Sequence, residues 1–304
     1  MRLADLTPAV PVALVGAGAA GGALARRLHH RGHVPAALLS RRRASAEAVG
    51  VPLGIPVCSD RLADLPADVR VVFCGVPDAA LPDVATALAA LDHPWGGTVV
   101  AHLSGALPAD VLAPLAYRGA TILSFHPMQT FAADAPHTVF DGIGVGVEGQ
   151  AEAVAWGCRC AEYLGTTPVP LSPDAKTRYH LAAVVASNFF VTLMGMAREI
   201  LGQAGLPADT QALLLRPLVD GTWRNLAEHL PEDALTGPVA RADAPTLQRH
   251  LDDLAEHLPH LVPAYAALSI EAVRLAIRGG HLSGRDAQHL LDLLYSAVTT
   301  ERLG

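Results

Sequence analysis

Hydrophobic residues follow two different patterns along this chain, and the pattern changes near residue 170. Before that point, short apolar runs alternate with amphipathic stretches, as repeated strand–helix–strand units require. After it, nearly every segment has the helical period of about 3.6 residues. The pattern predicts an α/β domain with a doubly wound sheet over residues 1–170, followed by an all-helical domain over residues 171–304.

The predicted strands are short and apolar, and we expect them at residues 12–15, 36–39, 69–74, 98–102, 121–125, 143–147 and 167–171. Helices are expected at residues 19–31, 44–49, 79–91 and 109–116, and longer ones at 174–204, 210–228, 244–258 and 263–278. Residues 181–197 are uncharged, but polar residues interrupt them and they fall short of the roughly 20 apolar residues of a membrane span. We therefore interpret this stretch as a buried helix and expect no membrane partner.

Composition narrows the class of protein. The 304 residues are 51% hydrophobic and 17% charged, which favours a compact globular chain of two domains over a disordered one. The net charge is −7 and no long basic run is present, so nucleic acid is not an expected partner. The four cysteines lack the spacing of a disulfide framework or a zinc site, which indicates reduced thiols and a cytoplasmic location.

A glycine-rich turn follows the first predicted strand. Gly16, Gly18 and Gly21 have the spacing of the dinucleotide-binding fingerprint, at the junction of a strand and a helix. Gly16 permits a tight turn, Gly18 lets the backbone approach a pyrophosphate, and Gly21 allows close packing of helix and strand. Ala19 and Ala20 complete the first helical turn, whose backbone N–H groups bind the anion. The motif predicts a dinucleotide site in a Rossmann-type domain.

The residues after the second predicted strand indicate which dinucleotide binds. NAD-binding domains usually place an acidic residue there for the ribose 2′-hydroxyl, whereas this chain has Ser40, Arg41, Arg42 and Arg43. A hydroxyl and guanidinium groups suit a 2′-phosphate, so the predicted cofactor is NADP(H). The alternative is a solvated basic turn that binds no phosphate, in which case NADH and NADPH would bind equally well.

Three more strand ends lead into loops on the cofactor side of the predicted sheet. Val76 and Pro77 are expected to contact the cofactor. Ser104 is a candidate donor to a substrate oxygen, although a Ser-Gly pair is equally typical of a plain turn. His126 precedes Pro127 at the rim of the expected nicotinamide cleft, where a neutral imidazole can exchange a proton with the substrate. The alternative is that His126 only bonds to loop backbone.

Polar residues recur on one face of the first long predicted helix. At about 100° per residue, Lys176, His180 and Ser187 share a face, and Asn188 lies at its edge. Buried polar groups need partners, so these residues either line a substrate cleft or form a structural network at an interface.

His250, Asp253 and His257 also share a helix face. A leucine-rich amphipathic helix with a charged outer face explains their spacing, and no metal site is predicted.

Six ordered segments resemble one family. They are GAGAAGGAL, CGVPDAAL, HLSGALPADVL, SFHPMQTF, YHLAAVVASNF and ALTGPVARAD, and the resemblance as a whole covers the chain from about Pro11 to about Ala276. Together they resemble the Rossmann-like, DUF2520-containing oxidoreductases, which are grouped with pyrroline-5-carboxylate reductase, ketopantoate reductase and 6-phosphogluconate dehydrogenase. The resemblance implies an NADP-linked fold whose helical domain serves for dimerisation, and therefore a homodimer. Ala242 stands where that family's pattern leads us to expect a glycine.

The segment His126-Pro127-Met128 is similar to the His-Pro-Met segment of prephenate and arogenate dehydrogenases, whose histidine contacts the substrate hydroxyl. This similarity implies that His126 faces the substrate, although the glycine that usually follows is absent here. Hydroxyacid dehydrogenases of the same superfamily use a helix lysine and asparagine, for which Lys176 and Asn188 are loosely spaced counterparts.

The leading hypothesis is an NADP(H)-dependent oxidoreductase that moves a hydride to or from a small polar carbonyl/hydroxyl or imine/amine substrate. His126 would exchange the proton and Thr236 would lie on a covering loop. The residues expected to orient the substrate are Ser104, Lys176, His180 and Asn188. Two alternatives stay open, a dehydrogenase of the prephenate or arogenate type and an NADPH-binding redox sensor without turnover.

Overall fold

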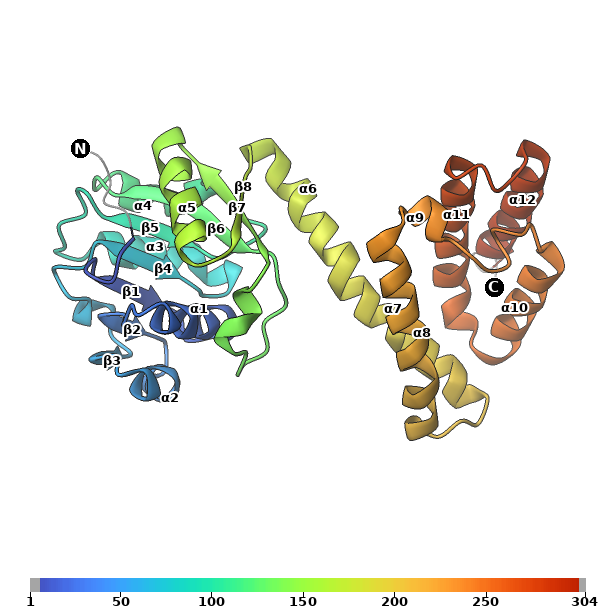
Figure 1. Cartoon of the computed structure of the whole chain (residues 1–304), viewed down its shortest axis with the longest axis horizontal. Coiled ribbons are helices and arrows are strands. Elements are labelled where there is room, and N and C mark those ends of the chain that lie inside the picture. The colour runs from blue at the N-terminus through green and yellow to red at the C-terminus, as the bar shows by residue number, and fades with distance from the viewer. Residues whose placement is uncertain (1–5, 301–304) are drawn as a thin grey trace. The chain divides into compact units, whose positions relative to one another are not determined.

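The computed structural model describes residues 6–300, which divide into two compact units. The first unit ends at Asn188 and contains a sheet with its helices, and the second begins at Phe189 and is helical (Figure 1). The predicted fold class, a Rossmann-type α/β domain followed by helices, is confirmed. The boundary predicted near residue 170 falls at the end of the last strand, β8 (Thr167–Pro170), so one more helix stays with the sheet unit.

Within residues 6–300, eight strands form one sheet in the order β3-β2-β1-β4-β5-β6-β7-β8. Strands β1 to β6 run parallel, β7 is antiparallel to β6, and β8 is again parallel to β7. Besides β8, the strands are β1 (Val12–Val15), β2 (Ala37–Leu39), β3 (Val57–Ser59), β4 (Val71–Cys74), β5 (Val99–His102), β6 (Thr121–Pro127) and β7 (Gly144–Gly149). The strand order reverses between β1 and β4, and in such sheets ligands bind outside the carboxyl ends of the strands at this point.

Apolar side chains alternate between the two faces of each central strand. In β1, Leu14 packs on one face and Val15 on the other, and both are at most 3% exposed. Helices α1 (Ala19–His30) and α5 (Ala151–Tyr163) cover the first face. Helices α3 (Leu81–Ala89) and α4 (Ala113–Ala116) cover the second. Burial on both faces explains why the central strands have continuous apolar runs in the sequence.

The shorter elements of the sheet unit lie in its connections. They are α2 (Arg43–Gly50), η1 (Val51–Leu53), η2 (Leu62–Asp64), η3 (Asp78–Ala80), η4 (Ala109–Leu112) and η5 (His137–Phe140). Strand β3, helix α5 and helix α12 (Gly284–Thr300) were not predicted from the sequence. Because β3 has three residues, it is too short to show a period of two.

The helix predicted over residues 174–204 is divided into three parts. Helix α6 (Pro173–Ala183) passes into a π-helical turn, η6 (Val184–Asn188), and α7 (Phe189–Gln203) begins the second unit. Leu181 and Val191 are 57% and 68% exposed, so the interpretation of residues 181–197 as a buried helix is wrong for the single chain. The stretches Pro173–Gln203 and Pro259–Arg278 are long and apolar enough to cross a membrane, a test that core helices of soluble proteins also pass.

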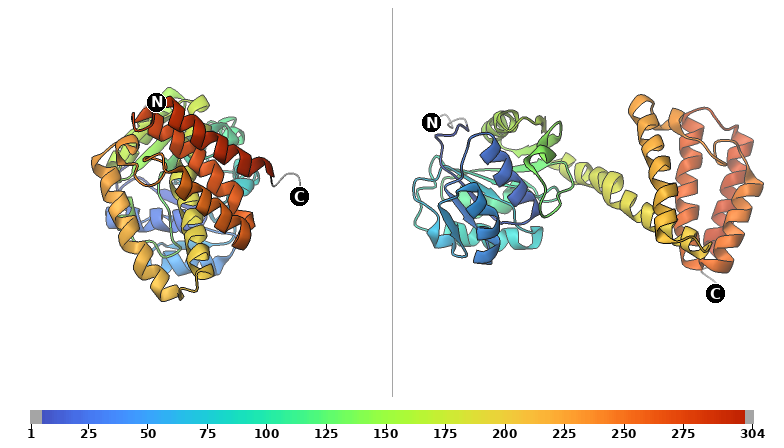
Figure 2. Two further views of the ribbon diagram at one scale, coloured as in Figure 1. Left: turned by 90° about the vertical axis from the view of Figure 1, so that its right-hand side faces the viewer. Right: turned by 60° about the horizontal axis from the view of Figure 1, so that its bottom comes forward.

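The second unit contains α8 (Ala208–Glu228), α9 (Pro231–Ala234), α10 (Ala244–His257), η7 (Pro259–Leu261), α11 (Val262–Arg278) and α12. Helices α10, α11 and α12 pack together and share a core that includes Leu247, Val273 and Leu290 (Figure 2). Among the described residues, Ala242 is the one non-glycine residue with positive φ, at 53°. A glycine adopts this conformation without steric cost, which accounts for the glycine expected there.

Candidate functional site

The glycine turn between β1 and α1 depends on close backbone contacts. Gly16 has a φ of +108°, and a Cβ on it would lie 2.6 Å from the carbonyl carbon of Gly75. A Cβ on Gly21 would clash with the carbonyl group of Gly16. Gly18 lies at the N-terminus of α1, and a Cβ on it would have its nearest neighbour, the Gly75 carbonyl oxygen, 3.9 Å away. Packing therefore requires glycine at positions 16 and 21, and Gly18 leaves open space where an anion can approach backbone N–H groups.

A cavity of about 450 Å³ opens beside this turn, at the carboxyl ends of β1, β2 and β4. The predicted cofactor residues in its wall are Gly16, Gly18, Ser40, Arg41, Arg42, Val76 and Pro77. Ala19, Ala20 and Gly21 lie outside the wall, in the first turn of α1. The structure thus brings most of the predicted cofactor residues together at the point where the strand order reverses.

The end of the cavity near β2 has mixed charge. Arg41 and Arg42 line it, whereas the Arg43 guanidinium turns to Glu47, with 2.7 Å between Nε and Oε1. Two polar lining residues were missed from the sequence, Ser45 in α2 and Asp60 after β3. Ser45 adds a hydroxyl to the predicted anion site. Asp60 adds a carboxylate, whose charge opposes a phosphate group and whose oxygens suit a hydroxyl.

His126 lies near the end of β6 among other aromatic and imidazole side chains. Its Nδ1 is 3.3 Å from the hydroxyl oxygen of Tyr179, and its ring centroid is 6.1 Å from that of His180. A Cβ on Gly105 would lie 2.7 Å from His126 Nε2 and 2.6 Å from His180 Nδ1. Burial lowers the pKa of His126 to about 4, and the positive charges of Lys176 and His180 act in the same direction. His126 is therefore neutral at neutral pH.

Lys176 reaches from α6 into the interior of the sheet unit and is 1% exposed. Its ammonium group donates to the Ser104 carbonyl oxygen at 3.1 Å and to the Ser124 hydroxyl. Burial lowers the pKa of Lys176 to about 8, although the negative charges of Glu148 and Asp78 partly oppose this shift. Lys176 therefore ties α6 to β6 and to the loop after β5, and its ammonium does not face open space.

Three buried polar residues lie side by side across the sheet. His102 of β5 pairs with Ser124 of β6, and Ser124 pairs with Glu148 of β7. The Ser104 backbone N–H donates to His102 Nδ1 at 3.2 Å, and the Ala109 N–H donates to Glu148 Oε2 at 2.7 Å. Together with the Lys176 bond, these contacts fix both ends of the loop that carries Gly105 against the two imidazoles.

The remaining predicted substrate residues take different positions. The Ser104 hydroxyl oxygen accepts backbone N–H bonds from Ala106 and Leu107, so it also holds its own turn. Asn188 is exposed in η6, about 18 Å along the helix from Lys176. Thr236 follows α9 in the second unit. The sheet unit thus brings His126, His180, Lys176 and Ser104 together, and Asn188 lies apart from them.

Sequence reasoning missed Tyr179 and Glu148 in this cluster. Gly146 of β7 pairs with His126, and a Cβ on it would lie 2.8 Å from Tyr179 Cζ. The missing side chain at Gly146 therefore leaves a slot for the tyrosine ring beside His126. A glycine inside a strand marks such close approach, and this was the signal available in the sequence.

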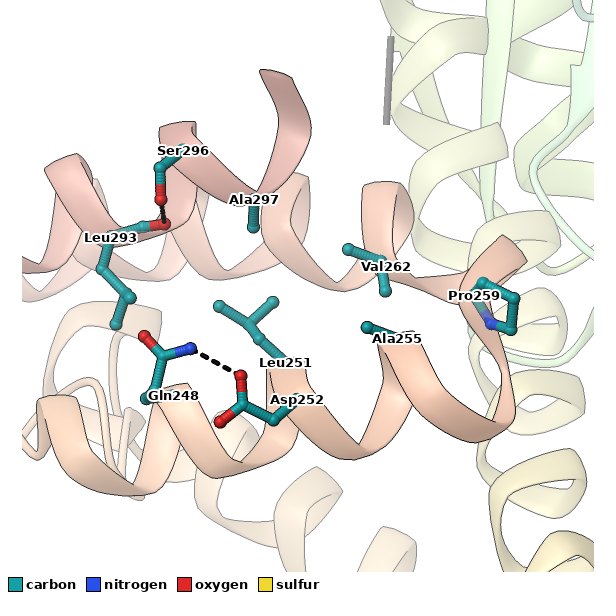
Figure 3. A pocket seen from close by; sticks show the side chains of 9 residues that line it. All are labelled: Gln248, Leu251, Asp252, Ala255, Pro259, Val262, Leu293, Ser296 and Ala297. Carbon is teal, nitrogen blue, oxygen red and sulfur yellow. Dashed lines mark hydrogen bonds between the residues drawn. The ribbon is translucent and has the colours of Figure 1, made fainter. Parts of the chain in front are cut away.

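A second cavity of about 350 Å³ lies between α10, α11 and α12, with Leu251, Val262 and Leu293 in its wall (Figure 3). At its rim the Gln248 side-chain amide donates to Asp252 Oδ1 at 2.7 Å.

The three helix residues with metal-like spacing have protein partners. His250 contacts the Tyr265 hydroxyl at 2.7 Å, and His257 lies 3.4 Å from a carboxylate oxygen of Asp253. Within residues 6–300, no group of three or more His, Cys, Asp or Glu side chains is placed to hold a metal ion.

Two family comparisons cover most of the chain. Residues 3–127 match the model of the Rossmann-like domain, and residues 143–272 match that of the domain of unknown function DUF2520. The DUF2520 match begins at the start of β7, inside the sheet, so it includes Glu148 as well as Lys176, Tyr179 and His180. No protein with a curated function matches this sequence.

Solved structures with a similar fold come from several organisms. A candidate NADP oxidoreductase from Bacteroides fragilis is 26% identical, with a TM-score of 0.70 over 87% of this chain and 98% of that one. A protein from Thermotoga maritima is 24% identical, with a TM-score of 0.64 over 96% and 99%. A reductive aminase from Aspergillus terreus, solved with NADPH and ethyl-5-oxohexanoate, is 18% identical, with a TM-score of 0.58 over 96% and 94%. These comparisons support an oxidoreductase that uses a nicotinamide dinucleotide.

Proposed function

Because this chain belongs to the family of proteins that join a Rossmann-like domain to a DUF2520 domain, we propose that it is an NADP(H)-dependent oxidoreductase. Its substrate is a small polar molecule with a carbonyl/hydroxyl or an imine/amine pair. The observation that carries the proposal is the position of His126 at the same sheet edge as the glycine-turn cavity. NADP(H) held by the glycine turn and the β2 loop would supply or accept the hydride, and the protein's own residues would supply orientation and a proton path.

The cavity wall supports NADP(H) as the cofactor. Gly16 and Gly18 leave the backbone open to a pyrophosphate at the N-terminus of α1. Ser40, Arg41 and Arg42 suit the 2′-phosphate, because guanidinium groups bind phosphate with two parallel hydrogen bonds. Asp60 weakens this preference by its negative charge, and the arginines outnumber it.

His126 is the proposed proton-exchanging residue. Its neutral ring has one nitrogen directed to Tyr179 and the other to Gly105, so it can accept or donate one hydrogen bond toward a substrate. Positioned proton transfer of this kind contributes roughly 100-fold or more to a rate. His180 shares the Gly105 surface and is proposed to orient the substrate.

Lys176 and Ser104 are proposed as positioning residues that hold the Gly105 loop, since their polar atoms bond to the protein itself. Asn188 is proposed to orient a part of the substrate that extends to η6.

The test is hydride transfer by the purified full chain in both directions. NADPH is supplied with a panel of small keto acids and cyclic imines, and NADP+ with the corresponding hydroxy acids and cyclic amines, and NADPH absorbance is followed. Replacing His126 by alanine should lower the detected rate by roughly 100-fold. His29→Ala is the matched control, because His29 is exposed on α1. A His126→Ala rate within a few-fold of the unmodified protein would remove His126 from the reaction.

We also propose a homodimer formed through the helical region, in the cytoplasm and without membrane or nucleic-acid partners. Support comes from apolar side chains exposed on α8 of the single chain, where Leu213, Leu218 and Trp223 are 66–72% exposed. Exposed apolar patches of this kind mark interaction surfaces. Light scattering of the detergent-free protein should give a molar mass twice that of the chain. Trp223→Glu should lower this molar mass toward that of a single chain.

A further inference from the structure

The hydroxyl group of Tyr179 has two partners on His126, and its oxygen also accepts a hydrogen bond from the backbone N–H of Gly146. Its oxygen lies 3.3 Å from the Nδ1 atom of His126 and 3.4 Å from the backbone carbonyl oxygen of His126. The two rings meet edge to face, with centroids 5.5 Å apart. The ring of Tyr179 packs against Gly146, whose missing side chain leaves the space that the ring fills. Its hydroxyl is therefore held beside one particular side of the imidazole.

Hydrogen-bond chemistry selects one arrangement of protons in this group. A hydroxyl has one proton and two acceptor lone pairs, and a carbonyl oxygen can only accept. The hydroxyl therefore satisfies both partners only when it donates to the His126 carbonyl and accepts a hydrogen bond from His126 Nδ1–H. If it donated to Nδ1 instead, the carbonyl contact would have no proton.

We infer that Tyr179 fixes His126 in the tautomer with its proton on Nδ1, so that Nε2 accepts a hydrogen bond from an O–H or N–H group of the substrate. In this form Nε2 has a lone pair and no proton. It suits the hydroxyl, amine or protonated imine form of a substrate, and a ketone oxygen, itself an acceptor, gains nothing from it. Tyr179 is thus a positioning residue for His126, and the inference rests on the proposed function for what the substrate is.

The surroundings of His126 keep its ring neutral near neutral pH, and only a neutral ring has a choice of tautomer. A neutral ring has two tautomers, whereas a cationic ring has protons on both nitrogens. The titratable groups that interact with His126 are Lys176, His180, His102 and Tyr179, and none of them has a negative charge to favour the cation. Burial and the charges of Lys176 and His180 keep its pKa low, so the neutral form is the one present.

The test is ¹⁵N NMR of the histidine rings in the uniformly labelled full chain, where the shifts of Nδ1 and Nε2 distinguish the tautomers. The unmodified protein should show the Nδ1–H form of His126 as the dominant species between pH 6 and 8. Tyr179→Phe keeps the ring and removes the hydroxyl, and should reduce the Nδ1–H form to a minor share. Tyr163→Phe is the matched control, because its hydroxyl contacts the Arg31 carbonyl instead, and it should leave His126 unchanged.

A second variant keeps the inference testable if Tyr179→Phe does not fold. Gly146→Ala retains the hydroxyl and displaces it, since the new Cβ would lie 2.9 Å from the Tyr179 oxygen. It should also lower the Nδ1–H share. An Nε2–H form in the unmodified protein, or an unchanged Nδ1–H share in the variants, overturns the inference. Because the measurement needs no turnover, an inactive protein would contradict the proposed function and leave this result readable.

Discussion

Replacing Lys176 by methionine should change how the stability of the sheet unit depends on pH. In the folded protein burial lowers the pKa of Lys176 to about 8, compared with an ordinary value of 10.5 in an unfolded chain. Between these values the unfolded state binds more protons than the folded state, so the free energy of unfolding rises with pH. At pH 7 both states are protonated and the cost of burying the charge is present in full. The cost is relieved as the pH rises through 8 toward 10.5.

The size of the effect follows from the two pKa values. A difference of 2.5 pKa units corresponds to about 3 kcal/mol, of which about 2 kcal/mol is gained between pH 7 and pH 9.5. Methionine fills a similar volume and does not titrate. The difference between unmodified and variant unfolding free energies should therefore shift by about 2 kcal/mol over this range, in favour of the lysine at high pH.

The assay is urea unfolding followed by tryptophan fluorescence. Trp95 and Trp156 are each 1% exposed in the sheet unit, whereas Trp223 is 71% exposed, so the signal change reports mainly on the sheet unit. Buried thiols such as Cys74, whose pKa burial raises to about 12, lower stability at high pH in both proteins and cancel in the difference. The account of Lys176 would be refuted if the difference in unfolding free energy between the two proteins changed by less than about 0.5 kcal/mol from pH 7 to pH 9.5. Changes of that size arise even between independent sites.

Three further perturbations have expected outcomes. Gly21→Ala should weaken NADPH binding at least tenfold by calorimetry, because the new Cβ clashes with Gly16. Gly22→Ala, whose new Cβ has its nearest contact at 3.5 Å, should bind NADPH normally, and equal affinities of the two variants would contradict the packing argument. Because burial lowers the pKa of His126 to about 4, the pH profile of kcat/KM should show no bend caused by His126 between pH 5.5 and 7.5. A bend near pH 6.5 that His126→Gln abolishes would contradict the conclusion that the imidazole is neutral. Ala242→Gly should raise the free energy of unfolding by up to about 1 kcal/mol by relieving its φ of 53°, and a loss of stability in thermal unfolding would contradict the strain.

The central strands and the glycine turn could be predicted because local sequence determines them. The apolar run at residues 12–15 is β1 as predicted, and the spacing of Gly16 and Gly21 reflects contacts with the immediately adjacent backbone. Strand β7 pairs antiparallel with β6, and its direction is set by the connection over residues 128–143, whose sequence has no strong signal.

The candidate site was predicted only in part, because its geometry depends on contacts between distant segments. Tyr179 meets His126 across 53 residues, and Lys176 meets Ser104 across 72. The helical pattern placed Lys176 and His180 on one face, but it could not show that Lys176 points into the protein and is 1% exposed. The same pattern suggested a buried helix over residues 181–197, whose apolar positions are exposed in the single chain.

Comparative binding of NADPH and NADH to the purified chain, measured by calorimetry, tests the central claim most directly. We predict that NADPH binds at least tenfold more tightly, since one or two charged hydrogen bonds to the 2′-phosphate are worth about 1.5–3 kcal/mol each. Arg41→Ala with Arg42→Ala should remove this preference, and Arg43→Ala should keep it, because Arg43 pairs with Glu47. Equal affinity for the two dinucleotides in the unmodified protein, or no binding of either, would contradict the account.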